Sequence, residues 1–495
     1  MNWRIIWKSL GRSDMRNRIL AVLGILLLSR VLAHIPVPLA SPETLKQVLT
    51  NLFNAETPQF LSFLDVLSGG ALANFSIILV GLGPYINASI IMQLLSRAIP
   101  QLEQIQKDGE YGRKKINQYT RMLTLPLAII QSVGAIYLIR QYAQQVGGIG
   151  DITANTSMMQ WVLMVAALTG GAMIMMWLGE MITEQGIGNG ISLLITIGIV
   201  SGLPSTISSI AGSVFDGQNK WVVWGNTLPM NAEAFRFAAI ILVVVVLMTM
   251  IIVTLNEGAR RLTINYAKRV QGNRAYGGVT TTLPVKMITA GVIPIIFALA
   301  FLSLPSFIGQ LLINNSSARL QELGNNLYTW FQAPTSQTLT QGGWEPFIYP
   351  VAYFLLVFLF TFFYTSITFN AHDIAENLQK QGGFIDGVRS GSATEKYLGR
   401  VVNRLTLFGG LALGLLAVSP IIGQYFLNTN ITIGGTSLLI LVAVALETLR
   451  SVESRALMVT YDQYEQADYF TETDEPKRRG LRRLAPRRRK RRNDG

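Results

Sequence analysis

Few residues in this 495-residue sequence could carry out covalent chemistry. Cysteine is absent, which excludes disulfides, thiolate metal sites and cysteine nucleophiles. The two histidines, His34 and His372, are too far apart in sequence to indicate a metal site. The GxxxxGKS and GxxxxGKT phosphate loops, the GxSxG and HExxH motifs and acidic metal clusters do not occur. The sequence therefore predicts a protein that is not an enzyme, with no catalytic residue, no metal and no cofactor.

Charged residues inside the long apolar runs are also few. Arg30 and His34 lie toward the outer end of the first run, and Glu180 lies near the inner end of the fourth. Arg30 either snorkels or pairs with a loop carboxylate, and a structural role is favoured. Ion-coupled transporters carry carboxylates or charge relays at mid-depth, whereas mid-depth positions here are Ile, Leu, Gly, Ser and Thr. We therefore expect an apolar cavity wall suited to a hydrophobic constriction.

The elements that position these residues are membrane-spanning helices. The chain is 50% hydrophobic and 14% charged, where a soluble protein carries about 25% charged residues. A helix of about 20 apolar residues crosses a bilayer, and the first run is too long for a signal-peptide core, so we interpret it as a retained span. Ten such spans are predicted, at roughly 17–38, 74–96, 119–141, 158–182, 188–208, 233–256, 285–309, 346–370, 400–424 and 432–456.

Lys and Arg are distributed asymmetrically among the connections. They gather at the N-terminus and between spans two and three, six and seven, and eight and nine, whereas each opposite connection holds at most one. The positive-inside rule then places both termini in the cytoplasm. Five spans followed by five more would give two halves of opposite orientation, as in inverted repeats. The predicted organisation is an N-terminus (1–16), two halves (17–208 and 233–456) and a basic tail (457–495).

One apolar stretch, at about 60–72, is too short to cross the membrane and ends in the pair Gly69–Gly70. It precedes a span interrupted by Gly81, Gly83 and Pro84. Lipid cannot satisfy broken backbone, so such a segment is expected to re-enter the membrane inside protein or against a water-filled cavity. The alternative is an amphipathic helix lying on the outer leaflet.

The cytoplasmic connections are longer than topology alone requires. Residues 257–284 mix basic residues with β-prone ones and predict a protruding hairpin, and residues 371–398 form a second protrusion punctuated by glycines. The tail carries eleven basic residues from Lys477 to Arg492. Such a block does not fold, and it is suited to anionic lipid or to the RNA of a docked ribosome, with lipid slightly favoured.

Several long motifs resemble the SecY family (SecY/Sec61-alpha), the channel subunits of the Sec protein translocase. The motifs are GLGPYINASIIMQLL (81–95), KDGEYGRKKINQYTR (107–121), WLGEMITEQGIGNGISLLI (177–195), RRLTINYAKR (260–269), GVIPIIFA (291–298), FYTSITFNAHDIAENLQKQGGFIDGVR (363–389) and GGTSLLI (434–440). The likeness covers about residues 15 to 465. It implies an all-α polytopic fold with ten transmembrane helices in two inverted pseudo-symmetric halves around a central pore, closed by a short plug helix.

The resemblance also implies roles for particular residues. The plug would be the 60–72 segment, with Phe60, Leu61, Phe63, Leu64, Leu67, Gly69 and Gly70. The pore ring would be formed by Leu82, Ile86, Ile191, Ile195, Ile296 and Ile440. Within each of the pairs 82/86 and 191/195 the spacing of four places both side chains on one helical face. Docking of a motor or ribosome would use Arg260, Arg261, Lys268, Arg269 and Arg389.

A lateral gate is implied between the second and seventh spans, lined by 84–95 and 287–301. The family often has an Asn three residues before GVIP, but Ile288 stands there in this sequence. We therefore expect a more apolar gate. The sequence after Leu446 follows the family only loosely, and no counterpart of the arginine tail is recognised.

These observations predict the central subunit of a passive protein-conducting channel. Unfolded secretory chains would cross through the ring, and apolar segments would leave sideways into lipid. The expected partners are SecE and SecG, the motor SecA, a ribosome, signal sequences and anionic lipids at the tail, with SecDF and YidC as further candidates. The expected location is the bacterial cytoplasmic membrane. There are two alternative functions. A secondary transporter of a small solute would leave the long basic loops unexplained, and a structural scaffold would leave the plug and ring unexplained.

Overall fold

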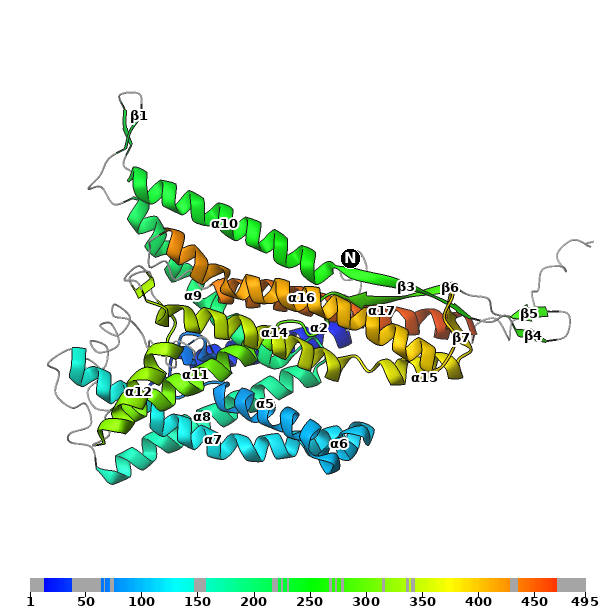
Figure 1. Ribbon diagram of the computed structural model, residues 1–495, viewed down its shortest axis with the longest axis horizontal. Helices are drawn as coiled ribbons and strands as arrows, with labels where there is room; N and C mark the ends of the chain where they lie inside the picture. The colour runs from blue at the N-terminus through cyan, green and yellow to red at the C-terminus, as the bar shows by residue number, and fades with distance from the viewer. Residues whose placement is uncertain are drawn as a thin grey trace, which may run out of the picture.

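The computed structural model describes residues 13–37, 64–65, 67–71, 75–146, 157–215, 221–223, 226–228, 231–266, 269–271, 274–276, 280–313, 317–334, 338–339, 343–427 and 435–469. Helices dominate, and the longest ones run side by side in one bundle (Figure 1). They are α2 (Ser13–Leu32), α5 (Gly83–Ala98), α6 (Pro100–Lys107), α7 (Gly109–Val146), α8 (Met158–Glu184), α9 (Gly190–Val214), α10 (Ala232–Glu257), α11 (Ile293–Ile313), α12 (Ala318–Phe331), α14 (Ile348–Thr368), α15 (Ala371–Lys380), α16 (Ser392–Leu427) and α17 (Gly435–Tyr469).

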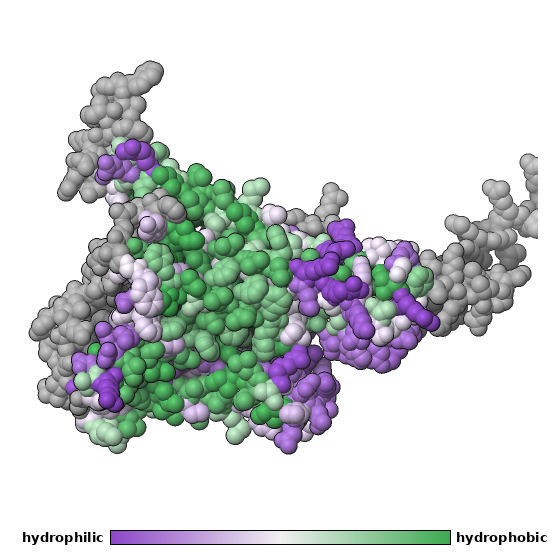
Figure 2. Space-filling model, in the orientation of Figure 1, coloured by the Kyte–Doolittle hydropathy of each residue, from purple (hydrophilic) through white to green (hydrophobic). Residues whose placement is uncertain are grey.

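The bundle has the surface of a membrane protein. An apolar band covers its middle, with hydrophilic side chains gathered toward the ends (Figure 2). Seven of the described helices are long and apolar enough to span a bilayer, and in the most apolar part of α10 only 6% of residues are buried. A helix that is apolar on all sides yet exposed faces lipid or another membrane helix. The chain is therefore a multi-pass membrane protein.

Each of the ten predicted spans coincides with a helix, although α2, α5 and α17 do not reach the length and apolarity of the other seven. The count of ten therefore stays a prediction. The second span was predicted to begin at 74, but residues 75–82 form turns and α5 begins only at Gly83. Positive φ angles at Phe75 (43°) and Gly81 (54°) are incompatible with continuous helix there.

Two further boundaries differ from the prediction, one at the start of a span and one at the end. The seventh span was predicted from 285, but β6 (Thr280–Lys286) occupies that start and α11 begins at Ile293. In the opposite sense, α17 continues to Tyr469, so the first part of the predicted basic tail is helical. Residues 470–495, which include the arginine run, lie outside the described residues.

A small sheet projects from one end of the bundle (Figure 1). Strand β3 (Ala259–Tyr266) pairs antiparallel with β6, with Ala259 opposite Lys286, which confirms the predicted hairpin in 257–284. β3 also pairs with β7 (Gly383–Ile385) from the second protrusion, so the two loops form one unit. Two further hairpins are β1 (Trp221–Val223) with β2 (Asn226–Leu228) and β4 (Arg269–Gln271) with β5 (Arg274–Tyr276).

This unit of β3, β6, β7 and α15, called the platform below, has its own apolar core. Its inward side chains pack against the start of α16. The buried members are Leu262, Ile264, Val285, Leu378, Ile385, Leu398, Val401 and Val402. Alternation along β3, with Leu262 and Ile264 buried and their neighbours exposed, is the pattern of a strand with one solvated face.

Candidate pore and gate

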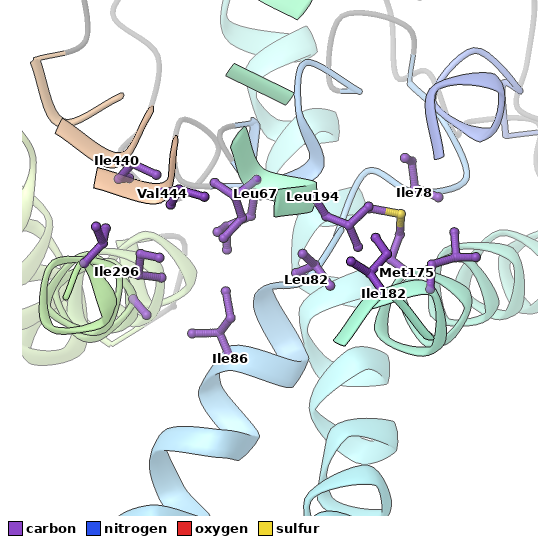
Figure 3. Close-up of a cluster of buried hydrophobic side chains, with 14 of the residues drawn as sticks. Leu67, Ile78, Leu82, Ile86, Met175, Ile182, Leu194, Ile296, Ile440 and Val444 are labelled. Carbon is purple, nitrogen blue, oxygen red and sulfur yellow. The ribbon is translucent and has the colours of Figure 1, made fainter. Parts of the chain in front are cut away.

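An apolar cluster occupies the middle of the bundle, and its members come from α2, α5, α8, α9, α11 and α17 and from the connecting segments between them. All six residues predicted for the ring belong to it or pack against it: Leu82, Ile86, Ile195, Ile296 and Ile440 are at most 5% exposed, and Ile191 is partly buried. Figure 3 shows Ile86, Ile296 and Ile440 directed into a common space from three different helices. Side chains far apart in sequence thus meet in one apolar cluster.

The cluster contains members that the sequence analysis missed. Val444 lies one turn after Ile440 on α17, and Leu194 precedes Ile195 on α9 (Figure 3). Val444 repeats the spacing of four that marks the other two helices, so the same rule could have found it. Asn189 fixes the start of α9, because its side-chain oxygen accepts hydrogen bonds from the backbone N–H groups of Ile191 (3.1 Å) and Ser192 (3.5 Å).

The described part of the predicted plug, residues 64–65 and 67–71, lies inside the bundle. Leu67 is 3% exposed and belongs to the central cluster, and Figure 3 shows it between Val444, Leu82 and Leu194. Leu64 is fully buried in a second cluster formed with α7 and α8. Such burial is incompatible with the alternative of a helix lying on the outer leaflet. Phe60, Leu61 and Phe63 lie outside the described residues.

A glycine turn sets the place of this segment. Gly69 and Gly70 have positive φ angles of 71° and 81°, and the Gly70 N–H donates to the Asp65 carbonyl at 2.9 Å. A Cβ on Gly69 would lie 2.4 Å from the Cα of Gly198 in α9, and a Cβ on Gly81 would lie 2.9 Å from the Leu67 carbonyl oxygen. Only glycine permits these backbone approaches.

The first helix contributes a cation to this turn. An Arg30 Nη1 hydrogen donates to the Gly69 carbonyl at 2.8 Å and to the Ser201 hydroxyl at 2.9 Å. We expected Arg30 to snorkel or to pair with a loop carboxylate. In the structure its hydrogen-bond acceptors are instead a backbone carbonyl and a hydroxyl. His34 Nδ1 lies 2.9 Å from the Arg30 carbonyl, one turn away. Glu180 pairs with Arg121 of α7 at 2.7 Å and thereby ties α7 to α8.

Buried polar side chains lie near the α5–α11 contact. Ile288 is buried (4% exposed), but the neighbouring helices α5, α7 and α11 carry several buried polar side chains. These are Asn87, Gln131, Ser303, Ser306 and Gln310, each at most 5% exposed. The Gln131 amide oxygen lies 3.2 Å from the position of a Cβ on Gly83, so α7 and α5 meet there. The more apolar gate stays a prediction, because among these residues only Asn87 lies within the predicted lining of 84–95 and 287–301.

Polar and aromatic contacts extend from this region toward the platform end of the bundle. Arg97, in the last turn of α5, donates to the Ser366 carbonyl of α14 at 2.9 Å. Phe297 of α11 packs edge-to-face on Phe360 and Tyr364 of α14, with ring centroids 6.0 and 6.3 Å apart. No sequence pattern indicated the Arg97 contact, because its acceptor is a main-chain atom.

The platform exposes the basic residues predicted for docking. Arg260 and Arg261 are exposed on β3, and Arg389 is exposed in the turn between Gly387 and Gly391, both of positive φ. Lys268 lies outside the described residues, and the side chain of Arg269 in β4 is not described. The amide of Asn265 donates to the Asp386 carboxylate at 2.7 Å, which joins the hairpin to the Arg389 turn.

A cavity of about 550 Å³ opens beside the central cluster at the platform end. It is bounded by α17, the end of α14 and the segment before α11. Its charged lining residues are Lys286, Glu447, Arg450 and Arg455. Arg450 donates to the Glu257 carboxylate at 2.6 Å and to the Asn256 carbonyl at 2.9 Å, so it also holds the end of α10 against α17. The described residues thus line a cavity with charged walls beside the central apolar cluster.

Comparison with solved structures defines the class of protein to which this fold belongs. A solved structure of a protein-conducting channel superposes with a TM-score of 0.55 over 90% of this chain and 94% of that chain, at 18% identity. The Sec61 channel from a canine ribosome–channel complex of the endoplasmic reticulum gives 0.52 over 90% and 94%, also at 18% identity. The fold is that of the protein-conducting membrane channels.

Sequence relatives narrow the class to a family. The SecY family model matches residues 76–449. The protein translocase subunit SecY of Mycobacterium tuberculosis is 38% identical over 462 residues, covering 92% of this chain and 98% of that protein. The corresponding subunit of Streptomyces galbus is 37% identical over 457 residues, covering 91% and 96%. The chain belongs to the SecY family of protein translocase channel subunits.

Proposed function

We propose that the chain is the central subunit of a Sec translocase, which passes unfolded secretory proteins across the membrane and releases apolar segments sideways into lipid. The observation that supports this function is the apolar cluster that Leu67 shares with Leu82, Ile86, Ile195, Ile296 and Ile440, with Ile191 packed against it. A narrow apolar constriction excludes water. Branched aliphatic side chains also have no hydrogen-bond preference, so every passing residue meets the same surface.

The proposed plug is the 60–72 segment, and its described part lies among these side chains in the resting state. Its Leu67 lies inside the seal and its glycine turn rests against α9. Withdrawal of Leu67 would leave the ring as the remaining barrier, which then closes around the moving chain. The channel supplies this route, and a motor or a translating ribosome supplies the work.

The proposed lateral gate lies between α5 and α11. Separation of these helices would open a path from the central cluster to lipid. Apolar residues favour the bilayer by about 0.3 to 0.6 kcal/mol each, so a long apolar segment leaves and a polar one continues across. The buried polar side chains Asn87 and Gln131 beside the gate interact better with each other or with water than with lipid. Exposing them to lipid would be unfavourable, so they favour the closed gate.

The proposed partners dock on the platform, through the exposed Arg260, Arg261 and Arg389. SecA or a ribosome suits such a basic surface, since both present acidic groups or phosphates. SecE and SecG would cover apolar faces of the bundle, and α10 is the most exposed of those faces. Further proposed partners are SecDF, YidC and signal sequences, together with anionic lipids at the arginine tail. The positive-inside rule supports a cytoplasmic platform, cytoplasmic termini and residence in the bacterial inner membrane.

Deletion of residues 60–70 tests this function. The variant should fold and leak small ions in a planar-bilayer conductance assay, because the ring alone seals less well than the ring filled by Leu67. A deletion variant as tight as the parent channel would remove the plug assignment. A solute transporter, the rival function, predicts instead a saturable uptake of small molecules by proteoliposomes and no ion leak upon deletion.

A further inference from the structure

We infer that Arg30 is a positioning residue that latches the plug segment in its resting place. The inference rests on the proposed function of this segment, which it deepens. The latch consists of one guanidinium nitrogen of Arg30 shared between the Gly69 carbonyl at 2.8 Å and the Ser201 hydroxyl at 2.9 Å. It joins three parts of the chain, α2, the glycine turn and α9, at one point.

The latch has a defined seat. Gly69 and Gly198 approach so closely that a Cβ on either would lie 2.4 Å from the other's Cα. A Cβ on Gly69 would also lie 2.5 Å from Nη2 of Arg30. The guanidinium therefore lies directly over the turn, and the turn lies directly on α9. Any movement of the segment away from α9 must break the hydrogen bond to Arg30.

The energetics favour a latch over a passive contact. Arg30 occupies the last turn of α2, where the helix dipole favours a cation. A hydrogen bond from a charged donor is about twice as strong as a neutral one, and a charge at membrane depth that loses its partner is costly. Departure of the plug would therefore leave Arg30 with Ser201 as its remaining acceptor at this point, which biases the equilibrium toward the closed state.

The latch is also releasable. Nε and Nη2 of Arg30 are buried and find no hydrogen-bond partner among the described residues. A guanidinium with donors in reserve can exchange the Gly69 carbonyl for another acceptor, such as a water molecule admitted when the gate opens. The plug is thus held by a bond that lasts in the dry resting state and is replaced in the hydrated one.

The cysteine-free sequence permits a direct test of the position of the segment. Ser68 is 1% exposed, and a single Ser68→Cys substitution adds a thiol there with little change in size. In purified, reconstituted full-length channel, a membrane-impermeant maleimide added from outside should modify this thiol slowly. Adding Arg30→Gln should raise the modification rate at least on the order of tenfold, while Arg30→Lys, which keeps the charge with a single nitrogen, should give an intermediate rate.

A matched control uses the other arginine of α2 that donates to a main-chain carbonyl. Arg18 contacts the Gln185 carbonyl at 3.3 Å, far from the glycine turn. Arg18→Gln should leave the modification rate of the introduced thiol unchanged. If Arg30→Gln reduces the yield of folded channel, Ser201→Ala is used instead. It removes the second acceptor of Arg30 and a weak hydrogen bond from the Ser201 hydroxyl to the Gly69 carbonyl at 3.5 Å, so it should raise the rate by a smaller factor. An unchanged rate in Ser201→Ala would then overturn the latch.

The outcomes separate the latch from the plug function. Equal modification rates with and without Arg30→Gln would overturn the latch, whatever the deletion of 60–70 does to conductance. A raised rate together with a deletion variant that does not leak would keep the latch and overturn the proposed sealing role. A raised rate in Arg30→Gln and Arg18→Gln alike would mean general loosening of α2 and would also overturn the latch.

Discussion

The central cluster and the platform are built from opposite kinds of interaction. In the cluster, Ile86, Ile296, Ile440 and their neighbours meet through apolar contacts that have no direction. In the platform, a hydrogen-bonded sheet carries Arg260 on β3, and the turn that follows β7 presents Arg389. Non-directional contacts can part and close again around any side chain, whereas a hydrogen-bonded scaffold presents one pattern of charge. The chain thus combines a central cluster whose contacts do not discriminate between side chains with a platform suited to binding a specific partner.

The largest expected effect comes from making the cluster polar. Replacing Ile86, Ile191 and Ile296 together with Ser should hydrate the constriction and raise the resting ion leak on the order of tenfold or more. It should also relax the demand for apolar signal sequences, because a wetter closed state is easier to open. Single-channel conductance and a secretion assay with signals of graded hydrophobicity measure the two effects.

The control set for this triple change lies on the exposed faces of the same three helices. Ile91, Val200 and Ile308 are 38%, 37% and 48% exposed, so their replacement with Ser should leave the seal dry. Neighbours of the ring are less suitable, since Phe297 itself belongs to the central cluster. Equal leak from both sets, or from neither, would mean that the six residues do not form the ring.

The second prediction addresses recognition by the platform. Arg389→Glu should impair motor-driven secretion severalfold while the channel folds and inserts normally, because it reverses an exposed charge without touching the platform core. The matched control is Arg404→Glu, a charge reversal on α16 beyond the platform, which should leave secretion unchanged. Secretion by inverted vesicles at saturating ATP, compared with the amount of folded channel, distinguishes docking from stability. Normal secretion with the charge reversed at this position would remove Arg389 from the docking surface.

A smaller effect is expected at Arg97, where one directional bond joins the gate helix α5 to α14. Arg97→Gln removes the donor to the Ser366 carbonyl, a bond that contributes roughly 0.5 to 1.5 kcal/mol at such an exposed site. The open fraction of the gate should rise a few-fold. Paired spin labels on α6 and α15, which follow α5 and α14 along the chain, report the opening, and Arg113→Gln is the control. An unchanged distance distribution would show that this bond does not restrain the gate.

The smallest effect is a pH dependence confined to the platform. His372 Nδ1 lies 3.2 Å from the Glu395 carboxylate, and this hydrogen bond, aided by the nearby charges of Glu395, Glu376 and Asp373, raises the pKa of His372. A raised pKa means that the pair stabilises the folded platform below the unfolded-state pKa of about 6.5, and that this stabilisation is lost as pH rises through the higher folded value.

With only two histidines in the chain, ring-labelled His372 can be followed directly by NMR. Glu395→Gln should lower its titration midpoint toward the ordinary value. The difference in thermal stability between parent and variant should be present in mildly acidic buffer and absent in mildly alkaline buffer. A midpoint that does not move in the variant contradicts the contact.

The sequence predicted what depends on local pattern. Spacing of four placed Ile86 with Leu82 and Ile195 with Ile191, and β-prone residues among basic ones predicted the hairpin of β3 and β6. It did not predict contacts whose second partner is a main-chain group, such as Arg30 with Gly69 or Arg97 with Ser366. A carbonyl oxygen is present in every residue, so its choice as acceptor is decided by the fold alone. The pairing of β7 with β3 escaped for a related reason, since three residues carry too little periodicity.

The way the platform is attached to the bundle gives it mechanical leverage. Gly258 alone separates the end of α10 from β3, and the N–H of Met287, just after β6, donates to the Gly258 carbonyl at 2.9 Å. Shortly beyond Met287, α11 begins at Ile293. The two long strands are therefore a rigid arm clamped at its base to both helices, and β7 braces it from α15. We expect a sideways load on the tip of that arm to act as a torque on the start of α11, so that a docked motor can deliver work to the gate helix without touching it.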